Sequence, residues 1–172
     1  MATIKTVSGD ISRVGADALI TAINSGGMWF GGIDGVISRA AGNVFHSQAS
    51  KAMPLSDGQT VVAKGEGHVL KGAFKNVVFV VDDLQRPLRE IVYNGLKAAS
   101  DAGFAKVSLP TIRMGVMLGA VEKSVDEAVS EMASGVRKFL AEHPKTSVED
   151  ITFVVYNDDR TQSLLDSVLK AN

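Results

Sequence analysis

Short and almost continuously apolar runs alternate along the chain with helical patterns. The apolar runs are residues 18–23, 77–81, 106–109 and 151–156, with weaker ones at 4–7 and 60–63. Strands that are apolar on both faces are typical of a sheet covered by helices on its two sides. The runs therefore predict the strands of an α/β sheet.

Helical patterns lie between these runs. Pro87 can open a helix, and an apolar stripe follows it. Ser124 and Glu127 have the spacing of a capping box at the start of a second, longer stripe. Residues 36–41 and 164–169 predict two further helices.

The alternation of strands and helices predicts a three-layer α/β/α fold with a mixed, largely parallel central sheet. The length of the chain fits one domain, so residues 1–172 are interpreted as a single domain. Ligands of such sheets bind at the carboxyl ends of the strands. The loops after Ile23, Leu109 and Tyr156 are therefore the first places to look for function.

Composition narrows the classes of function. The chain has 45% hydrophobic and 22% charged residues, which is ordinary for a globular protein. It has no cysteine, and no segment resembles a signal peptide or a membrane span, so we expect a cytoplasmic protein. The formal net charge of −1, without a basic block, argues against duplex nucleic acid as a partner. Backbone amides can nevertheless hold a small anionic ligand.

The first loop, residues 24–35, is rich in glycine and joins a predicted strand to a predicted helix. Such a loop can bring its backbone close to a ligand, and the helix start that follows suits a phosphate. A flexible surface loop is the alternative. Asp34, in the first turn of the helix, can orient or deprotonate a water molecule, or it can simply cap the helix. Asn24 can contact a sugar hydroxyl, or it can form the turn.

The second loop, residues 110–119, also follows an apolar run. Gly115 and Gly119 allow main-chain amides to face a diphosphate, and Arg113 either adds charge there or is solvated. Asp10 can accept a hydrogen bond from an exocyclic amine. Tyr156 can stack on a base or pack in the core.

Several other chemistries lack their motifs. His46, His68 and His143 do not have the spacing of metal ligands, so no metal site is predicted. No serine lies in a nucleophile elbow, and no thiol is present. Covalent hydrolysis through these nucleophiles is therefore excluded.

Together these segments resemble the macrodomain family. The resemblance rests on residues 9–11, on Asn24, on residues 31–35 with the sequence Gly-Gly-Ile-Asp-Gly, and on residues 37–42. The spacing from Asn24 to Asp34 is similar to that of the MacroD-type hydrolase branch. The later segments 58–60 and 109–115 match more loosely, and the resemblance covers nearly the whole chain.

The resemblance implies a macrodomain fold with a cleft for ADP-ribose and no need for a metal or redox cofactor. It implies that Asp10 binds the adenine amine, that Ile11 lines the base pocket and that Tyr156 stacks near the adenine. Asn24 would contact the distal ribose, and Asp34 would orient the attacking water. The further ligand-binding residues implied are Gly31, Gly32, Ile33 and Gly35 in the first loop, and Met114, Gly115, Val116 and Met117 in the second.

Three positions depart from the family pattern. Thr21 replaces a usual asparagine, Met117 stands where an aromatic residue is usual, and residues 80–83 replace a His-x-x-Gly-Pro-like segment. Trp29 or Phe30 could supply the missing aromatic ring. These changes surround the distal ribose, where chemistry would occur.

Two functions therefore stay open, together with a generic nucleotide-binding domain. The first is hydrolysis of an ADP-ribose derivative by water attack near the distal ribose, with Asp34 and Asn24 as the catalytic residues. The substrate would be a mono-ADP-ribosylated protein, O-acetyl-ADP-ribose or ADP-ribose 1″-phosphate. The second is a non-catalytic ADP-ribose reader, which the changes at Thr21 and Met117 favour. No pattern indicates an oligomeric state.

Overall fold

A six-stranded sheet forms the centre of the computed structural model, which describes residues 2–26, 32–68, 70–113 and 118–171. Within these ranges the strand order is β1-β6-β5-β2-β4-β3. The strands are β1 (Thr3–Ser8), β2 (Ala16–Ile23), β3 (Thr60–Lys64), β4 (Phe74–Val81), β5 (Lys106–Leu109) and β6 (Asp150–Val155). All neighbours pair in parallel except β3, which is antiparallel to β4. The predicted mixed, largely parallel sheet is confirmed.

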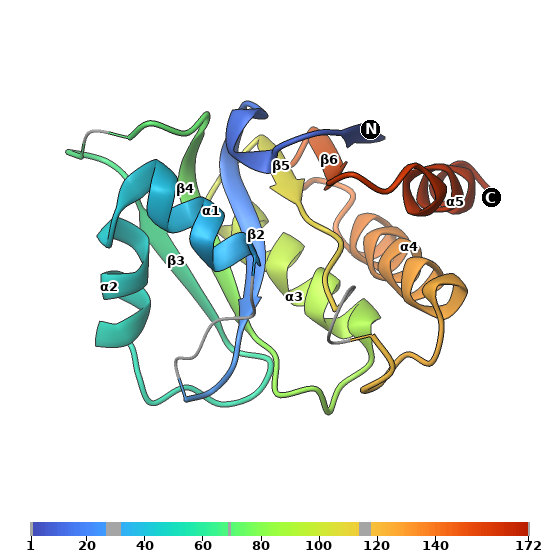
Figure 1. Ribbon diagram of the computed structural model, residues 1–172, viewed down its shortest axis with the longest axis horizontal. Coiled ribbons are helices and arrows are strands. Elements are labelled where there is room, and N and C mark those ends of the chain that lie inside the picture. Colours follow the sequence, from blue (N-terminus) through green and yellow to red (C-terminus); the bar gives the residue numbers. More distant parts are fainter. Residues whose placement is uncertain (1, 27–31, 69, 114–117, 172) are drawn as a thin grey trace.

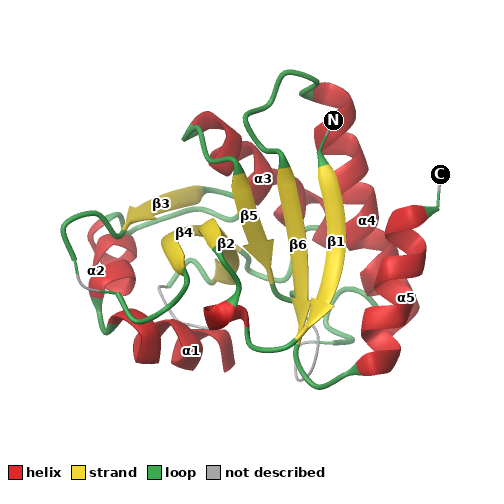
Figure 2. Cartoon of the chain, turned by 90° about the horizontal axis from the view of Figure 1, so that it is seen from above, coloured by secondary structure: helices red, strands yellow, loops and turns green. Residues whose placement is uncertain are grey.

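Helices cover both faces of the sheet (Figure 1, Figure 2). One face is covered by α1 (Gly32–Ala41) and α2 (Val44–Lys51), and the other by α3 (Leu88–Asp101), α4 (Val125–Glu142) and α5 (Asp159–Lys170). The central strand β2 serves both layers, because Leu19 packs into the core below α1 while its neighbour Ile20 packs into the core below α3. This double burial explains why the predicted strands are apolar without alternation.

The predicted helix starts are confirmed in their main features. The Ser124 hydroxyl accepts a hydrogen bond from the Glu127 amide at 3.1 Å, as a capping box requires. The carboxylate of Glu127 accepts from the Lys123 amide, one residue before the expected partner. Pro87 lies one residue earlier than expected, as the N-cap of α3.

Two elements were missed by the sequence patterns, the 3-10 turn η1 (Ile11–Arg13) and the helix α2. Only three of the eight residues of α2 are buried, and one of them is His46, so the helix has no apolar stripe to detect. A tight turn at Gly42 and Asn43 joins it to α1. Gly42 has φ +59, a left-handed conformation that glycine adopts easily at the end of a helix.

The carboxyl ends of the five parallel strands meet at one edge of the sheet. The loops that leave β1, β2, β4, β5 and β6 therefore all begin at this edge. The Gly9 amide, after β1, donates to the carbonyl of Val155 at the end of β6, and the Asp82 amide, after β4, donates to the carbonyl of Ile23 at the end of β2. The fold thus gathers the loops singled out by sequence.

Candidate functional site

Asp10 and Tyr156 lie on neighbouring strand ends, those of β1 and β6. The Oδ1 atom of Asp10 accepts hydrogen bonds from the amide of Ser12 at 2.9 Å and from its hydroxyl at 2.8 Å. These bonds from Ser12, the hydroxyl first, hold the pKa of the Asp10 carboxyl below its ordinary value. A half-exposed carboxylate is therefore available beside this strand end.

Tyr156 is the most exposed large apolar side chain among the described residues, with 78% of its surface accessible. The alternative that Tyr156 packs in the core is wrong, because β6 ends at Val155 and the tyrosine lies beyond it. Ile11, in contrast, is almost fully buried and belongs to the core below α1. Tyr156 thus provides an exposed ring at the end of β6, the strand that pairs with β1, which Asp10 follows.

Asn24 has the turn role that its position after β2 suggested. Its Oδ1 atom accepts a hydrogen bond from the Gly26 amide at 3.0 Å. The Ser25 amide donates to Asp83, and the Asp83 amide donates to Asp57. The start of the first loop is therefore tied to the loops that flank it on the next strands.

Asp34 lies in the first turn of α1 and meets an imidazole that the sequence did not connect with it. The Oδ1 atom of Asp34 lies 2.9 Å from Nε2 of His46, in α2. The His46 side chain is only 8% exposed, whereas the Asp34 side chain is 32% exposed. Both line a small cavity together with Thr21, Ala22, Ile33, Ile37 and Phe79. The geometry is that of an accessible carboxylate backed by a buried imidazole.

His46 was missed because no pattern in the sequence connects it with Asp34. The two residues belong to different helices, and their contact depends on the turn at Gly42. Burial lowers the pKa of His46 below its ordinary value, and the Asp34 carboxylate offsets part of that shift. The imidazole is therefore neutral at pH 7. A polar residue among the apolar positions Phe45 and Ala49 was the one available signal.

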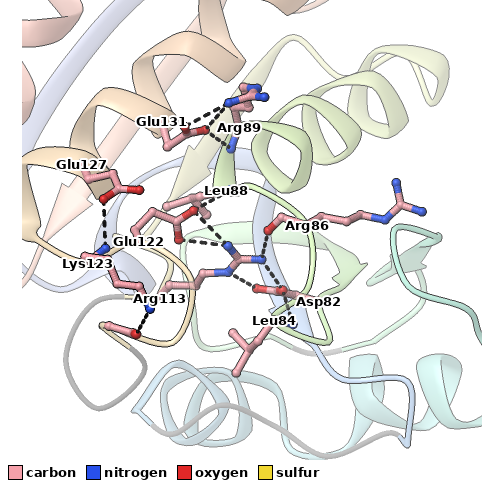
Figure 3. A network of polar contacts seen from close by, with 11 residues as sticks. Asp82, Leu84, Arg86, Leu88, Arg89, Arg113, Glu122, Lys123, Glu127 and Glu131 are labelled. Atoms are coloured by element: carbon pink, nitrogen blue, oxygen red, sulfur yellow. Dashed lines mark hydrogen bonds and ion pairs between the residues drawn. The ribbon is translucent and has the colours of Figure 1, made fainter.

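Arg113 is neither solvated nor directed at a ligand, so both sequence interpretations of this residue are wrong. Its guanidinium is buried between two carboxylates, as Figure 3 shows, and contacts Asp82 at 2.7 Å and Glu122 at 2.9 Å. A third bond goes to the carbonyl of Arg86. Burial disfavours the charged guanidinium, but the hydrogen bonds that it donates to both carboxylates outweigh this effect and raise the pKa of Arg113. We call Arg113, Asp82 and Glu122 the arginine clamp.

The arginine clamp joins three loops at the functional edge of the sheet. Asp82 follows β4, Arg113 follows β5, and Glu122 precedes α4. Glu122 also accepts a hydrogen bond from the amide of Leu88, the first residue of α3. The clamp therefore fixes the end of the sheet from which the second loop begins.

The remaining site predictions fall into two groups. Gly32, Ile33 and Gly35 lie on α1, in the same turn as Asp34 or next to it. Gly31 and the second-loop residues Met114, Gly115, Val116 and Met117 lie outside the described residues, as do Trp29 and Phe30. The described part of the site therefore consists of the sheet edge and the helices α1 and α2.

The described residues contain neither a metal-binding cluster nor a membrane-spanning helix. No group of three or more His, Asp or Glu side chains there could hold a metal ion. No described helix is both long and apolar enough to cross a membrane.

A family model shows to which protein family the chain belongs. The Macro domain model matches residues 20–128, which include the second half of β2, the helices α1 and α2 and the arginine clamp. The chain belongs to the macrodomain family. The match extends from the strand before the first loop into α4.

Related sequences carry little functional information. The macrodomain is 28% identical to a macro domain-containing protein of Cupriavidus necator, over 91% of each chain. It is also 28% identical to an uncharacterized protein of Thermotoga maritima, over 92% of this chain. The macrodomain spans only about a quarter of that protein, 27% of its length.

Solved macrodomains share the fold at low sequence identity. A Trypanosoma brucei macrodomain in complex with ADP-ribose has a TM-score of 0.79 and 22% identity, over 95% of this chain and 68% of the other. An Oceanobacillus iheyensis macrodomain with ADP has a TM-score of 0.72 and 22% identity, over 98% of this chain and 90% of the other. These likenesses confirm the macrodomain fold.

Two of the departures from the family pattern have structural roles in this macrodomain. Asp82 and Asp83, in the segment after β4, bind Arg113 and the Ser25 amide respectively. Thr21 is buried and lines the cavity shared by Asp34 and His46. Of these departures, only Thr21 lines that cavity, whose other walls include Ile33 and Ile37 from the matching segments.

Proposed function

We propose that this macrodomain binds ADP-ribose along the carboxyl edge of its sheet. Two observations on described residues support the adenine end, the ionised Asp10 carboxylate and the exposed Tyr156 ring on the adjacent strand end. The first turn of α1 would lie at the diphosphate, where unpaired helix amides favour anions. The ligands of the Trypanosoma brucei and Oceanobacillus iheyensis macrodomains, ADP-ribose and ADP, both contain the adenosine diphosphate group that this edge would bind.

We further propose that the bound ADP-ribose derivative is hydrolysed near the distal ribose. The observation that carries this proposal is the Asp34 carboxylate, which is accessible on one side and contacts a buried imidazole on the other. A carboxylate so placed can orient a water molecule and accept its proton as the water oxygen attacks. The candidate substrates are mono-ADP-ribosylated side chains, O-acetyl-ADP-ribose and ADP-ribose 1″-phosphate, and Asn24 would contact the distal ribose.

A non-catalytic ADP-ribose reader is the second candidate. The observation that favours it is Thr21, whose buried side chain lines the cavity beneath Asp34 where the family usually has an asparagine amide. The amide would be lost from the distal-ribose end, whereas the adenine end would be unaffected. A reader and a hydrolase are therefore expected to give the same result in the binding experiment below and different results in the turnover experiment.

The first experiment is a calorimetric titration with ADP-ribose, AMP and NAD. We expect micromolar affinity for ADP-ribose, about −8 kcal/mol, and weaker binding of the other two. Tyr156→Ala should weaken binding at least fivefold, since base stacking on an aromatic ring contributes about 1–3 kcal/mol. Tyr93→Phe, at the other tyrosine of the chain, is the control and should bind normally. Equal affinity of Tyr156→Ala and wild type would remove Tyr156 from the site.

The second experiment is a turnover assay with the three substrates, comparing wild type with Asp34→Asn. If Asp34 serves as the base, the variant should lose about 10²–10⁴-fold in kcat while binding ADP-ribose within a few-fold of wild type. Asp101→Asn, at the far end of α3, changes an exposed carboxylate and should keep full activity. If the wild-type protein binds ADP-ribose but turns over none of the substrates, the result would support the non-catalytic reader instead of the hydrolase.

A further inference from the structure

The contact between Asp34 and His46 divides the Asp34 carboxylate into a covered and an open part. The Oδ1 atom of Asp34 and the Nε2 atom of His46 are each buried from solvent, 2.9 Å apart. The side chain of Asp34 is nevertheless 32% exposed. The exposed part of Asp34 therefore excludes Oδ1, the oxygen that meets the imidazole.

The helix that carries His46 is firmly attached to the sheet. Phe45 and Ala49, on either side of His46 along α2, are fully buried in the core. The side-chain amide of Gln48 donates to the carbonyl of Lys64 at 2.7 Å and accepts from the Lys64 amide at 2.8 Å, as a neighbouring strand would. The His46 ring itself lies against Phe79 of β4. The imidazole is thus held in place independently of Asp34.

Asp34 is the charged group that faces His46 among the described residues. The other side chains of their shared cavity come from β2, β4 and α1 and include Thr21, Phe79 and Ile37, none of which titrates. Because burial lowers the pKa of His46, the imidazole is neutral at pH 7 and carries one N–H. At 2.9 Å from Oδ1, Nε2 is close enough for an N–H there to act on the carboxylate electrostatically without neutralising its charge, although the contact does not meet the angle required of a hydrogen bond.

We propose that His46 is a positioning residue that holds Oδ1 of Asp34 and so directs the second carboxylate oxygen toward the attacking water. The inference rests on the hydrolysis proposed above and assigns a task to a residue of α2, outside the glycine-rich loops. Partners of this kind fix the orientation of a reacting group, and their removal typically costs about 10–100-fold in activity. The effect falls on the chemical step, since His46 is buried away from the ligand.

The first test separates kcat from binding. His46→Ala should lower kcat by about 10–100-fold, with KM and the Kd of ADP-ribose within a few-fold of wild type. His46→Gln retains an N–H donor and should recover a large part of kcat, whereas His46→Met, which has a similar volume and no donor, should not. His68→Gln changes an exposed histidine and is the control. Equal kcat in folded His46→Gln and His46→Met variants would show that volume alone matters and would overturn the inference.

The second test does not require turnover. NMR titration of the His46 ring should give a lower pKa in Asp34→Asn than in wild type, because the carboxylate raises the pKa of His46. An unchanged pKa would show that the two groups do not interact and would overturn the inference while leaving the proposed hydrolysis intact. Absence of turnover in wild type would instead overturn the proposed hydrolysis, whatever the NMR result.

In wild type, protonation of His46 at acid pH adds a positive charge beside the carboxylate and weakens it as a base. The pH profile of kcat should therefore decline at a higher pH in wild type than in His46→Gln. Coincident profiles for the two proteins would also contradict the proposal.

Discussion

The arginine clamp and the contact between Asp34 and His46 lie at the same edge of the sheet, and both bury charged or polar groups. They differ in how many of their hydrogen-bonding atoms are engaged by other protein groups. In the clamp, Arg113 donates from all three guanidinium nitrogens. Both carboxylates that receive these bonds also accept a backbone amide, from Leu84 and Leu88. Asp34, in contrast, has a partly exposed carboxylate with a single imidazole behind it.

This difference distinguishes a group with a structural role from one that can still interact with a ligand. A buried charge network whose donors and acceptors are all engaged has no capacity left for a ligand, and it holds loops together. A carboxylate with one side open can still exchange water and substrate. Arg113 was expected either to add charge at a diphosphate or to be solvated, but its burial between two carboxylates gives it a structural role. The accessible atoms of Asp34 are where the proposed hydrolysis would take place.

The largest predicted effect is on the clamp. Arg113→Met should reduce the free energy of unfolding by about 3–5 kcal/mol, because it leaves Asp82 and Glu122 buried without their cation. Urea unfolding followed by circular dichroism measures the change. Arg89→Met is the matched control, because Arg89 pairs with Glu131 at 3.0 Å on the surface and should cost at most about 1 kcal/mol. Equal costs for the two variants would contradict the structural role of the clamp.

A smaller effect is predicted when a carboxylate is neutralised in each region. Asp82→Asn should cost about 1–3 kcal/mol in the free energy of unfolding, because Asp82 is fully buried and accepts two bonds from Arg113. Asp34→Asn should change it by less than about 1 kcal/mol, because Asp34 is partly solvated and has no cation to leave behind. The same urea experiment compares the two. A larger cost at Asp34 than at Asp82 would reverse the comparison.

The sequence predicted the layers well because they depend on local pattern. Apolar runs marked every strand among the described residues, clearly for β2 and β4, which are covered on both faces, and more weakly for the outer strands β1 and β3. Sequence could also place Asp34 in a first helical turn and Asp10 after a strand. Each of these features is encoded within a few residues of its own position.

The rest of the site depends on contacts between distant segments. His46 reaches Asp34 across a helix turn, and Arg113 reaches Asp82 across 31 positions of the chain. Whether an arginine is solvated or buried is decided by the carboxylates that the fold brings to it, which no local pattern reveals. The α2 helix was missed for a similar reason, since its attachment depends on the pairing of Gln48 with Lys64.

The smallest predicted effect is the pH dependence that His46 gives to folding. Its pKa in the folded protein lies below the value of about 6.5 expected in the unfolded chain. As the pH falls below about 6.5, the unfolded chain binds a proton that the folded protein does not yet bind, so stability is lost toward acid pH. Above that pH the imidazole is neutral in both states and contributes no slope.

Between about pH 5 and 7, wild type should therefore lose stability on acidification, by at most about 1.4 kcal/mol per pH unit for one proton. His46→Gln should flatten this part of the profile, whereas Asp34→Asn should steepen or extend it, since the carboxylate that raises the pKa of His46 is gone. The carboxyl groups with lowered pKa, Asp10 and Asp158 among them, contribute only at still lower pH. Urea midpoints measured across this range test the prediction, and identical slopes for wild type and His46→Gln would show that the buried imidazole does not titrate with folding.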